Sequence, residues 1–184
     1  MGGTRGQKWK RRKLGMVHVY TGDGKGKTTA ALGLGLRAVG HGYRVVVVQF
    51  MKGQLVYGEQ KAARNIKGFE IRQFGRKDFV DRDNPARVDR EWASKGLEYA
   101  RNVLTDGKHD VVILDELNVA LDWKLVTLED VLALIRNKAP QTELVITGRY
   151  AHPQVMELAD YVTEMREVSH PFRKGFLCAK GVDR

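Results

Sequence analysis

A glycine-rich turn between an apolar run and a helical pattern constrains the fold of this chain more than any other segment. Residues 20–29 read Tyr-Thr-Gly-Asp-Gly-Lys-Gly-Lys-Thr-Thr. Apolar side chains at positions 16, 17, 19 and 20 predict a buried strand before the turn, and residues 28–39 predict a helix after it. In that arrangement the backbone N–H groups of the turn and the positive end of the helix converge on one place, which favours a bound anion.

The residue types in the turn indicate which anion is bound. Glycines at positions 22, 24 and 26 let the backbone curl around a phosphate chain with no Cβ in the way. Lys27 can reach phosphate oxygens, and the hydroxyl of Thr28 is placed to ligate Mg²⁺. We therefore predict that the chain binds a nucleoside triphosphate, ATP, through Gly22, Asp23, Gly24, Lys25, Gly26, Lys27, Thr28 and Thr29.

One position departs from the common P-loop pattern, which has glycine, four residues and then Gly-Lys-Ser/Thr. That pattern expects glycine at position 21, where the chain has Thr21 and carries Gly22 one place later. Three glycines and two lysines also occur in flexible basic turns, so the motif alone leaves that alternative open.

A second motif places two acids directly after an apolar run. Residues 111–114 are apolar, and Asp115 and Glu116 follow them. We predict that Asp115 holds Mg²⁺ together with Thr28, either directly or through a water. Glu116 can complete the outer shell of the metal, orient a water, or pair with a lysine of the glycine turn. Acids after a strand also serve as helix caps or turn residues, but the spacing from the glycine turn is compatible with the two halves of a P-loop site.

Strand and helix patterns alternate along the rest of the chain. Strands are predicted at 44–50, 69–74, 111–114 and 144–147, and helices at 85–105, 127–138 and 153–160. This alternation predicts a doubly wound, mostly parallel sheet with helices on both faces, a three-layer α/β/α fold of the P-loop NTPase (RecA-like) type. Ligands of such sheets lie at the carboxyl ends of the strands, where the glycine turn is expected.

The charge of the chain is concentrated at its N-terminus. Residues 1–14 form a basic arm, predicted to be flexible, and contribute +6 of the net charge of +10; the remaining residues, 15–184, are predicted to form a single domain. The arm is either a solvated tail or a segment that folds over an anionic ligand, with Trp9 as a stacking group. Because so little of the excess charge lies outside the arm, the sequence does not favour binding to nucleic acid.

Composition also excludes several classes of protein. No stretch approaches the roughly 18 apolar residues of a membrane span, and the basic N-terminus lacks the apolar region of a secretory signal. The single cysteine, Cys178, excludes an internal disulfide framework and a zinc site built on several cysteines. We therefore expect a cytoplasmic protein that does not bind membranes.

Taken in order along the chain, several motifs resemble one family, the P-loop type ATP:corrinoid adenosyltransferases that act on cob(I)alamin and cob(I)yrinic acid a,c-diamide. Threonine in the first position of the glycine turn is that family's form of the motif. The matching segments are Thr21-Gly-Asp-Gly-Lys-Gly-Lys-Thr-Thr-Ala-Ala31, Arg37-Ala-Val-Gly-His-Gly42, Val48-Gln-Phe-Met-Lys-Gly53 with Gly58-Glu59, Leu114-Asp-Glu-Leu-Asn118, Thr147-Gly-Arg149, Ala159-Asp-Tyr-Val-Thr-Glu-Met165, and His170-Pro-Phe172 with Gly175 and Ala179-Lys-Gly-Val182.

The resemblance implies a reaction other than phosphoryl transfer. The cobalt(I) of a reduced corrinoid attacks C5′ of ATP, the whole triphosphate leaves, and a cobalt–carbon bond forms, as a step in the biosynthesis or salvage of adenosylcobalamin. The resemblance also implies Mg²⁺ with ATP, a homodimer, and a flavoprotein or other reductase that supplies electrons. The basic arm can then close over a neighbour's site.

Residue roles carry over from the resemblance position by position. Lys27 and Glu116 are expected to act in catalysis, Arg37 to lie near the adenosine end of the nucleotide, and Arg149 to bind phosphate or a corrin amide. Phe79 corresponds to an aromatic that displaces the lower ligand of cobalt. The chain departs from many bacterial relatives at Asp81, which occupies the position of an expected tryptophan, so that role rests on Phe79 and the preferred corrinoid stays open.

Two other functions remain as alternatives. A P-loop kinase or ATPase would act on the γ-phosphate and release ADP, whereas adenosyl transfer releases triphosphate. A nucleic-acid-binding ATPase, suggested by the pI of 9.8, would bind DNA or RNA in a salt-dependent way.

Overall fold

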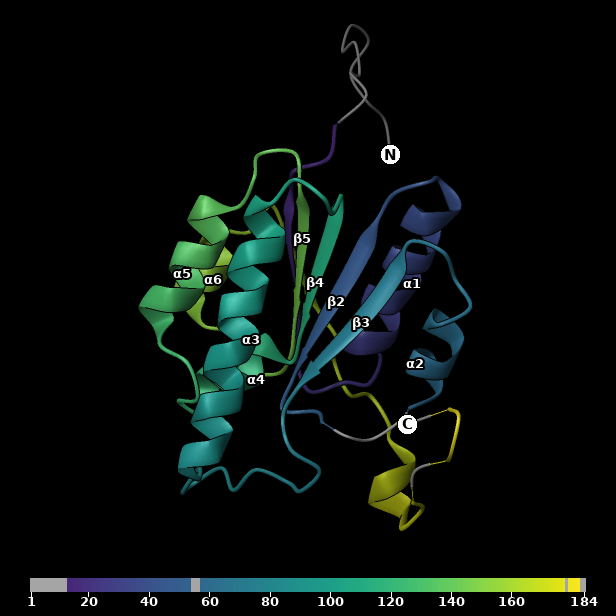
Figure 1. The fold of residues 1–184 in the computed structure, drawn as a ribbon. Coiled ribbons are helices and arrows are strands. Elements are labelled where there is room, and N and C mark those ends of the chain that lie inside the picture. Colours follow the sequence, from purple (N-terminus) through teal and green to yellow (C-terminus); the bar gives the residue numbers. More distant parts are fainter. Residues whose placement is uncertain (1–12, 54–56, 178, 183–184) are drawn as a thin grey trace, which may run out of the picture.

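The computed structural model describes residues 13–53, 57–177 and 179–182. Residues 1–12 of the predicted basic arm and Cys178 lie outside the described residues. Lys13 and Leu14, the last residues of the arm, lead into β1 at the end of the strands opposite to the glycine turn (Figure 1).

The described chain folds around one six-stranded sheet (Figure 1). Neighbouring strands of this sheet pair in parallel, and the strand order is β3-β2-β4-β5-β1-β6. This confirms the predicted doubly wound α/β fold, with a sheet that is wholly rather than mostly parallel. The strands are β1 (Val17–Thr21), β2 (Val45–Phe50), β3 (Phe69–Phe74), β4 (Val111–Asp115), β5 (Glu143–Thr147) and β6 (Tyr161–Glu164).

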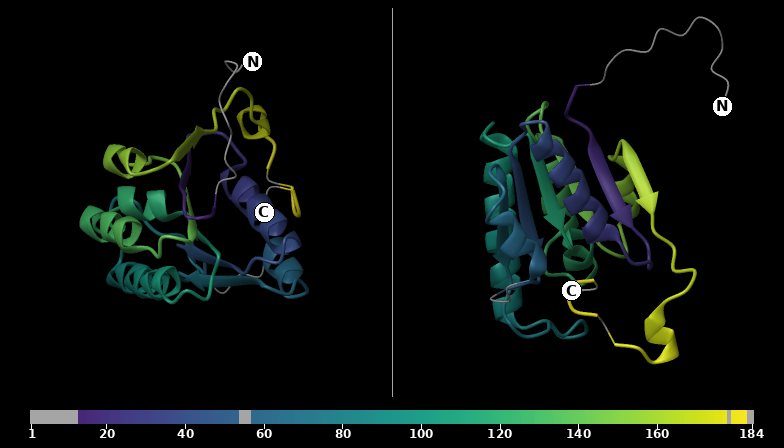
Figure 2. Two further views of the ribbon diagram at one scale, coloured as in Figure 1. Left: turned by 90° about the horizontal axis from the view of Figure 1, so that it is seen from above. Right: turned by 90° about the vertical axis from the view of Figure 1, so that its right-hand side faces the viewer.

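Helices cover both faces of the sheet and make the outer two layers (Figure 2). On one face lie α1 (Lys27–Gly40) and α2 (Gly58–Ala63). On the other lie α3 (Arg87–Thr105), α4 (Leu117–Asp122), α5 (Leu128–Asn137) and α6 (Pro153–Glu157), and a short 3₁₀ turn, η1 (Pro171–Lys174), follows β6.

The apolar runs of the sequence form a core on each side of the sheet. Every residue of β2 and β4 is buried, as expected for strands covered on both faces. Val46, Val48 and Phe50 face the cluster beneath α3, whereas Val45 and Val47 face α1. The two clusters hold the central strands rigidly, and the loops at their carboxyl ends form one edge of the molecule.

The predicted strands and the long helices are confirmed, but four elements were missed. The strand β6 was missed because it is a four-residue edge strand with every residue exposed and no apolar alternation, although Tyr161, Val162 and Thr163 are residue types that favour strands. The helices α2 and α4 span six residues each and are too short for a periodic pattern. The turn η1 is shorter still, and the helix expected at 153–160 ends at Glu157. Of the helices that the structure describes, none has both the length and the apolar character needed to cross a bilayer.

Candidate active site

The glycine turn curls between β1 and α1 as predicted. Gly22 and Gly26 have φ angles of 93° and 114°, a region that strongly favours glycine. The Nζ atom of Lys27 donates hydrogen bonds to the carbonyl oxygens of Gly22 at 2.7 Å and Gly24 at 2.6 Å. Burial lowers the pKa of Lys27, and the charge of Arg149 lowers it further. The ammonium is thus held inside the curl of the loop.

A segment that follows β6 packs directly on the glycine turn. The N–H of Gly24 donates to the carbonyl of Met165 at 2.6 Å, and the N–H of Glu167 donates to Oδ1 of Asp23 at 2.9 Å. That second hydrogen bond lowers the pKa of Asp23. A Cβ atom on Gly22 would lie 2.4 Å from the carbonyl oxygen of Met165. The glycines are therefore required by the chain that crosses them, in addition to the space they leave for a ligand.

Replacing Gly22 by alanine is expected to disrupt the turn. The new methyl group would clash with the backbone of Met165 and would sit at a φ of 93°, so we expect a destabilisation of about 2 kcal/mol together with weaker ATP binding. Gly33 is a matched control, because it lies within α1 and a Cβ there meets nothing within 4 Å. Gly33→Ala is expected to stabilise the protein by about 0.5–1 kcal/mol. Thermal unfolding of both variants gives the comparison, and equal melting temperatures would contradict it.

Asp115 lies at the end of β4 and is the centre of a hydrogen-bond network. Its Oδ1 accepts from the hydroxyls of Thr28 and Thr147, both at 2.8 Å. Its Oδ2 accepts from Nε2 of Gln49 at 3.1 Å and from Nζ of Lys52 at 2.9 Å. These four donors match the lone pairs of a carboxylate. The Asp115 side chain is buried, so all four of its hydrogen bonds are made in a water-poor site.

The folded structure favours the charged forms of Asp115 and Lys52 but disfavours the charged form of Glu116. Burial opposes ionisation of Asp115, but the charge and hydrogen bond of Lys52, with the hydroxyl donors, outweigh it and hold the pKa of Asp115 below its usual range. Burial likewise opposes the charge of Lys52, and the attraction of Asp115 outweighs it and raises the pKa of Lys52. For Glu116, burial and the neighbouring Asp115 raise the pKa. Asp115 and Lys52 therefore form a stable ion pair, whereas Glu116 is the more easily protonated acid.

A cavity of about 580 Å³ opens beside the glycine turn. The turn and the start of α1 line one wall. The rest of its lining comes from the end of β2 and from the segments after β2, β3, β4, β5 and β6. Its lining residues are Asp23, Gly24, Lys25, Gly26, Lys27, Thr28, Thr29, Phe50, Met51, Lys52, Tyr57, Phe79, Arg82, Glu116, Val119, Trp123, Arg149, Tyr150, His170 and Val182.

Backbone strain gathers around this cavity. Among the described residues other than glycine, four have a positive φ, namely Met51, Glu116, Lys124 and Tyr150, and all but Lys124 line the cavity. These three residues follow the ends of three strands: Met51 follows β2, Glu116 follows β4 and Tyr150 follows β5. A left-handed non-glycine residue costs about 1–3 kcal/mol and is found where function requires a particular geometry. The strain supports the assignment of this cavity as the functional site.

Most of the predicted site residues meet at this cavity. Arg149 is exposed on its wall and makes no ion pair with any residue that the structure describes. Gly22 and Asp115 belong to the site but do not line the cavity, and Asp115 lies behind Thr28.

Two residues singled out in the sequence, Arg37 and Asp81, do not line the cavity. Arg37 lies exposed in the last turn of α1 and is not on the cavity wall. It is about 15 Å from Lys27 along the helix axis, so its adenosine contact stays a prediction. Asp81, at the position of the expected tryptophan, accepts the backbone N–H groups of Asp83 and Asn84 and so forms a local turn.

Several residues at the site were not predicted as functional. Gln49, Lys52 and Thr147 bind Asp115, and the signal available for them was their place at or just after the carboxyl ends of predicted strands. Tyr57, Arg82, Trp123 and Tyr150 line the cavity from loops, for which the sequence carried no local signal.

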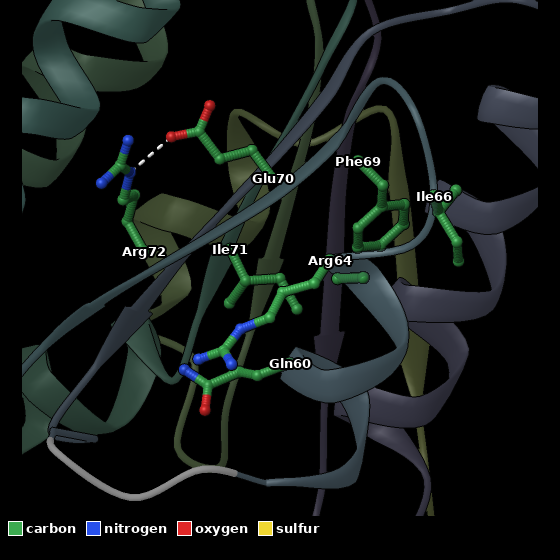
Figure 3. Close-up of a pocket in the computed structure, with 8 residues that line it drawn as sticks. Gln60, Arg64, Ile66, Phe69, Glu70, Ile71 and Arg72 are labelled. Atoms are coloured by element: carbon green, nitrogen blue, oxygen red, sulfur yellow. Dashed lines mark hydrogen bonds and ion pairs between the residues drawn. The ribbon is translucent and has the colours of Figure 1, made fainter.

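A smaller hollow of about 290 Å³ lies between α2 and the edge strand β3 (Figure 3). Gln60 and Arg64 reach into it from α2, and the ion pair between Glu70 and Arg72 lies beside it. It shares no lining residue with the larger cavity and contains none of the predicted site residues.

Comparison with known proteins gives one consistent result. The model of the family described as "ATP:corrinoid adenosyltransferase BtuR/CobO/CobP" matches residues 13–183. The chain is 38% identical over 172 residues to the "Corrinoid adenosyltransferase" of Escherichia coli (strain K12), and the match covers 92% of this chain and 85% of that protein. It is 37% identical over 173 residues to the protein of the same name from Pseudomonas aeruginosa, covering 94% and 85%. It is 36% identical over 170 residues to "Corrinoid adenosyltransferase CobA" of Salmonella typhimurium, covering 92% and 85%.

Proposed function

The chain belongs to the ATP:corrinoid adenosyltransferase family, and we propose that the cavity beside its glycine turn is where the two substrates meet. The protein transfers the 5′-deoxyadenosyl group of ATP to the cobalt(I) of a reduced corrinoid and releases triphosphate, a step of cobalamin biosynthesis. A kinase or ATPase acting on the γ-phosphate is not favoured. One observation carries the site assignment: a single cavity has the glycine turn on one wall and the exposed Phe79 on another.

The reaction balances without a general base. Cobalt(I) supplies the electron pair of the new cobalt–carbon bond, and the C5′–O bond breaks with its electrons going to the triphosphate oxygen. No proton is transferred to or from cobalt. The protein's work is therefore to align C5′ with cobalt and to stabilise the negative charge that develops on the leaving group. Backbone N–H groups of the glycine turn can donate hydrogen bonds to the triphosphate. Positive charge at the cavity comes from Lys25, Lys27 and Arg149.

The residues behind the turn fit a magnesium ion bound with ATP. No group of three or more His, Cys, Asp or Glu side chains that could hold a metal is gathered within the described ranges, and Mg²⁺ bound with a nucleotide needs few protein ligands because phosphates and waters supply the others. The hydroxyl of Thr28 donates a hydrogen bond to Asp115, so a lone pair of the Thr28 oxygen would be available to the metal, and Asp115 and Glu116 would hold it directly or through water. Bound Mg²⁺ would neutralise part of the triphosphate charge.

The supporting partners are also part of the proposal. We assign to Glu116 the role of balancing the charges of Lys27 and Lys52 and of holding metal-bound water, since these cations affect its ionisation. A homodimer, a reductase that supplies electrons and a cytoplasmic location follow from the family resemblance, and a single cysteine in 184 residues is consistent with the last. Residues 15–184 as a single domain, and a basic arm closing over a neighbouring site, belong to the same proposal.

Phe79→Ala tests the assignment of the corrinoid side of the cavity. The Phe79 side chain is 99% exposed on the cavity wall, so truncating it removes little folding energy. If Phe79 displaces the lower ligand of cobalt, the rate starting from cob(II)alamin and a reductant should fall by about tenfold or more, a barrier change of about 1.4 kcal/mol. The rate with pre-formed cob(I)alamin should stay closer to that of the wild type.

A matched control is Phe172→Ala, which truncates another exposed phenylalanine that does not line the cavity. That variant should behave as the wild type in both assays. Equal losses for Phe79→Ala from cobalt(II) and from cobalt(I) would mean that Phe79 does not act on the lower ligand of cobalt, and would remove that role from this proposal.

A further inference from the structure

The loop between β3 and α3, residues 75–86, contributes to the lining of the cavity. Phe79 and Arg82 of this loop line the cavity. Most residues of the loop are exposed, but Val80 packs against the core beneath α3 and Pro85 is buried. These apolar contacts are few, so polar contacts are also needed to fix the exposed residues of the loop.

One buried carboxylate binds both ends of this loop. Oδ1 of Asp89 accepts from Nε of Arg76 at 2.6 Å, and Oδ2 accepts from Nη2 of Arg76 at 3.2 Å. The same Oδ2 accepts the backbone N–H of Ala86 at 3.0 Å. The Asp89 side chain is 1% exposed and that of Arg76 is 30% exposed. A bidentate guanidinium–carboxylate pair at the base of the loop fixes both distance and direction.

The contact to Ala86 alone is an ordinary helix start. Asp89 is the third residue of α3, and an acid there accepts the N–H of the preceding cap residue in many helices. The contact to Arg76 is different, because Arg76 lies at the start of the loop, just after β3, and is not part of α3. It joins the exit of β3 to the entry of α3.

The base of the loop is also pressed against the nucleotide side of the site. A Cβ on Gly75 would lie 2.7 Å from the backbone N of Lys52, and a Cβ on Gly53 would lie 1.9 Å from the carbonyl oxygen of Gly75. The two loops therefore cross in backbone contact next to Lys52, which binds Asp115. A shift at Arg76 would move the Phe79 wall relative to this fixed crossing.

The second half of the loop contacts the segments after β4 and β5 through Arg82. Nη2 of Arg82 lies 3.3 Å from Oδ2 of Asp122 in α4, and its guanidinium lies 5.3 Å from the ring centre of Tyr150. These contacts are exposed and individually weak. The bidentate pair with buried Asp89 is the stronger restraint on the loop.

We propose that Arg76, held by Asp89, is a positioning residue that sets the loop carrying Phe79 and Arg82 for the corrinoid substrate. The inference rests on the proposed function of this cavity and deepens its corrinoid side. Asp23 and Gly24 of the glycine turn contact Glu167 and Met165 after β6, and Thr28 contacts Asp115; Arg76 and Asp89 take no part in these hydrogen bonds. Loss of the pair should therefore affect the corrinoid much more than ATP.

The test is steady-state kinetics of Arg76→Leu with cob(I)alamin and ATP varied in turn. We expect kcat/KM for the corrinoid to fall about tenfold, because small displacements of a positioning element cost this much or more. We expect the KM for ATP to stay within about twofold of the wild-type value. Arg76→Lys keeps the charge but loses the bidentate fork, so it should recover part of the loss.

Arg87→Leu is the matched control, since it breaks an exposed ion pair with Glu91 on the same helix and should leave both substrates unaffected. An unchanged corrinoid kcat/KM in a folded Arg76→Leu would overturn the proposal, as would equal losses for corrinoid and ATP. If Arg76→Leu does not fold, Arg76→Lys decides in its place by the same split. A wild-type protein that forms no alkylcobalt product would instead overturn the proposed function itself.

Discussion

Replacing Lys27 by alanine is expected to lower the rate of adenosyl transfer by about a thousandfold. Removing one donor that faces developing negative charge in a closed site typically costs about 10²–10³ in rate, and Lys27 is the residue held within the curl of the glycine turn. Initial rates with pre-formed cob(I)alamin and saturating ATP measure the effect directly, because this route bypasses reduction of the corrinoid.

The control for Lys27→Ala is Lys61→Ala, which removes an exposed lysine of α2 away from the cavity. It should retain wild-type activity. Lys27→Arg, which keeps the charge but not the shape, should recover only a small part of the rate. A Lys27→Ala variant as active as the wild type would mean that the triphosphate does not bind at this turn.

Replacing Lys52 by methionine is expected to have the largest effect on stability. Lys52 is the charged partner of Asp115, whose side chain is 1% exposed, and removing one partner of a buried ion pair typically costs about 3–5 kcal/mol because the other charge is left uncompensated. Arg44→Met, which breaks an exposed pair with Asp110, should cost about 1 kcal/mol or less. Denaturant unfolding at neutral pH measures both free energies of unfolding.

The pH dependence of unfolding identifies Asp115 as the source of that loss. In the wild type the pKa of Asp115 is lowered in the folded state, so its contribution to stability is present above the unfolded pKa of about 3.9 and is lost as the pH falls through the folded value. Without Lys52, burial is the largest remaining influence and raises the pKa of Asp115.

Protonation then favours the folded variant, so the difference in free energy of unfolding between wild type and Lys52→Met should shrink as the pH is lowered from 7 toward the unfolded pKa of about 3.9. A difference that stays constant over this range would show that Lys52 stabilises the fold through packing instead.

Local patterns were sufficient for the elements that position the nucleotide. The β-branched run at 45–48 and the apolar run at 111–114 are buried on both faces, so their composition alone identifies them as central strands. The two acids after β4 and the glycine turn after β1 then fall at one edge of the sheet by the geometry of parallel strands. Contact between Thr28 and Asp115 follows from that placement.

Contacts set by strand order could not be predicted in the same way. Lys52 meets Asp115 only because β2 lies next to β4 in the sheet, and no local pattern specifies which strands are neighbours. The pair of Arg76 with Asp89 depends on the path of an irregular loop. The crossing of Met165 over Gly22 depends on β6, a four-residue edge strand whose pairing with β1 no local pattern specifies.

The most direct test of the central claim is an anaerobic incubation of the protein with ATP, Mg²⁺ and chemically reduced cob(I)alamin. The corrinoid spectrum is followed, and the fragments of ATP are separated and quantified. We expect a light-sensitive alkylcobalt product and one inorganic triphosphate for each corrinoid converted. ADP and phosphate with an unchanged corrinoid spectrum would contradict adenosyl transfer and return the protein to the kinase or ATPase class.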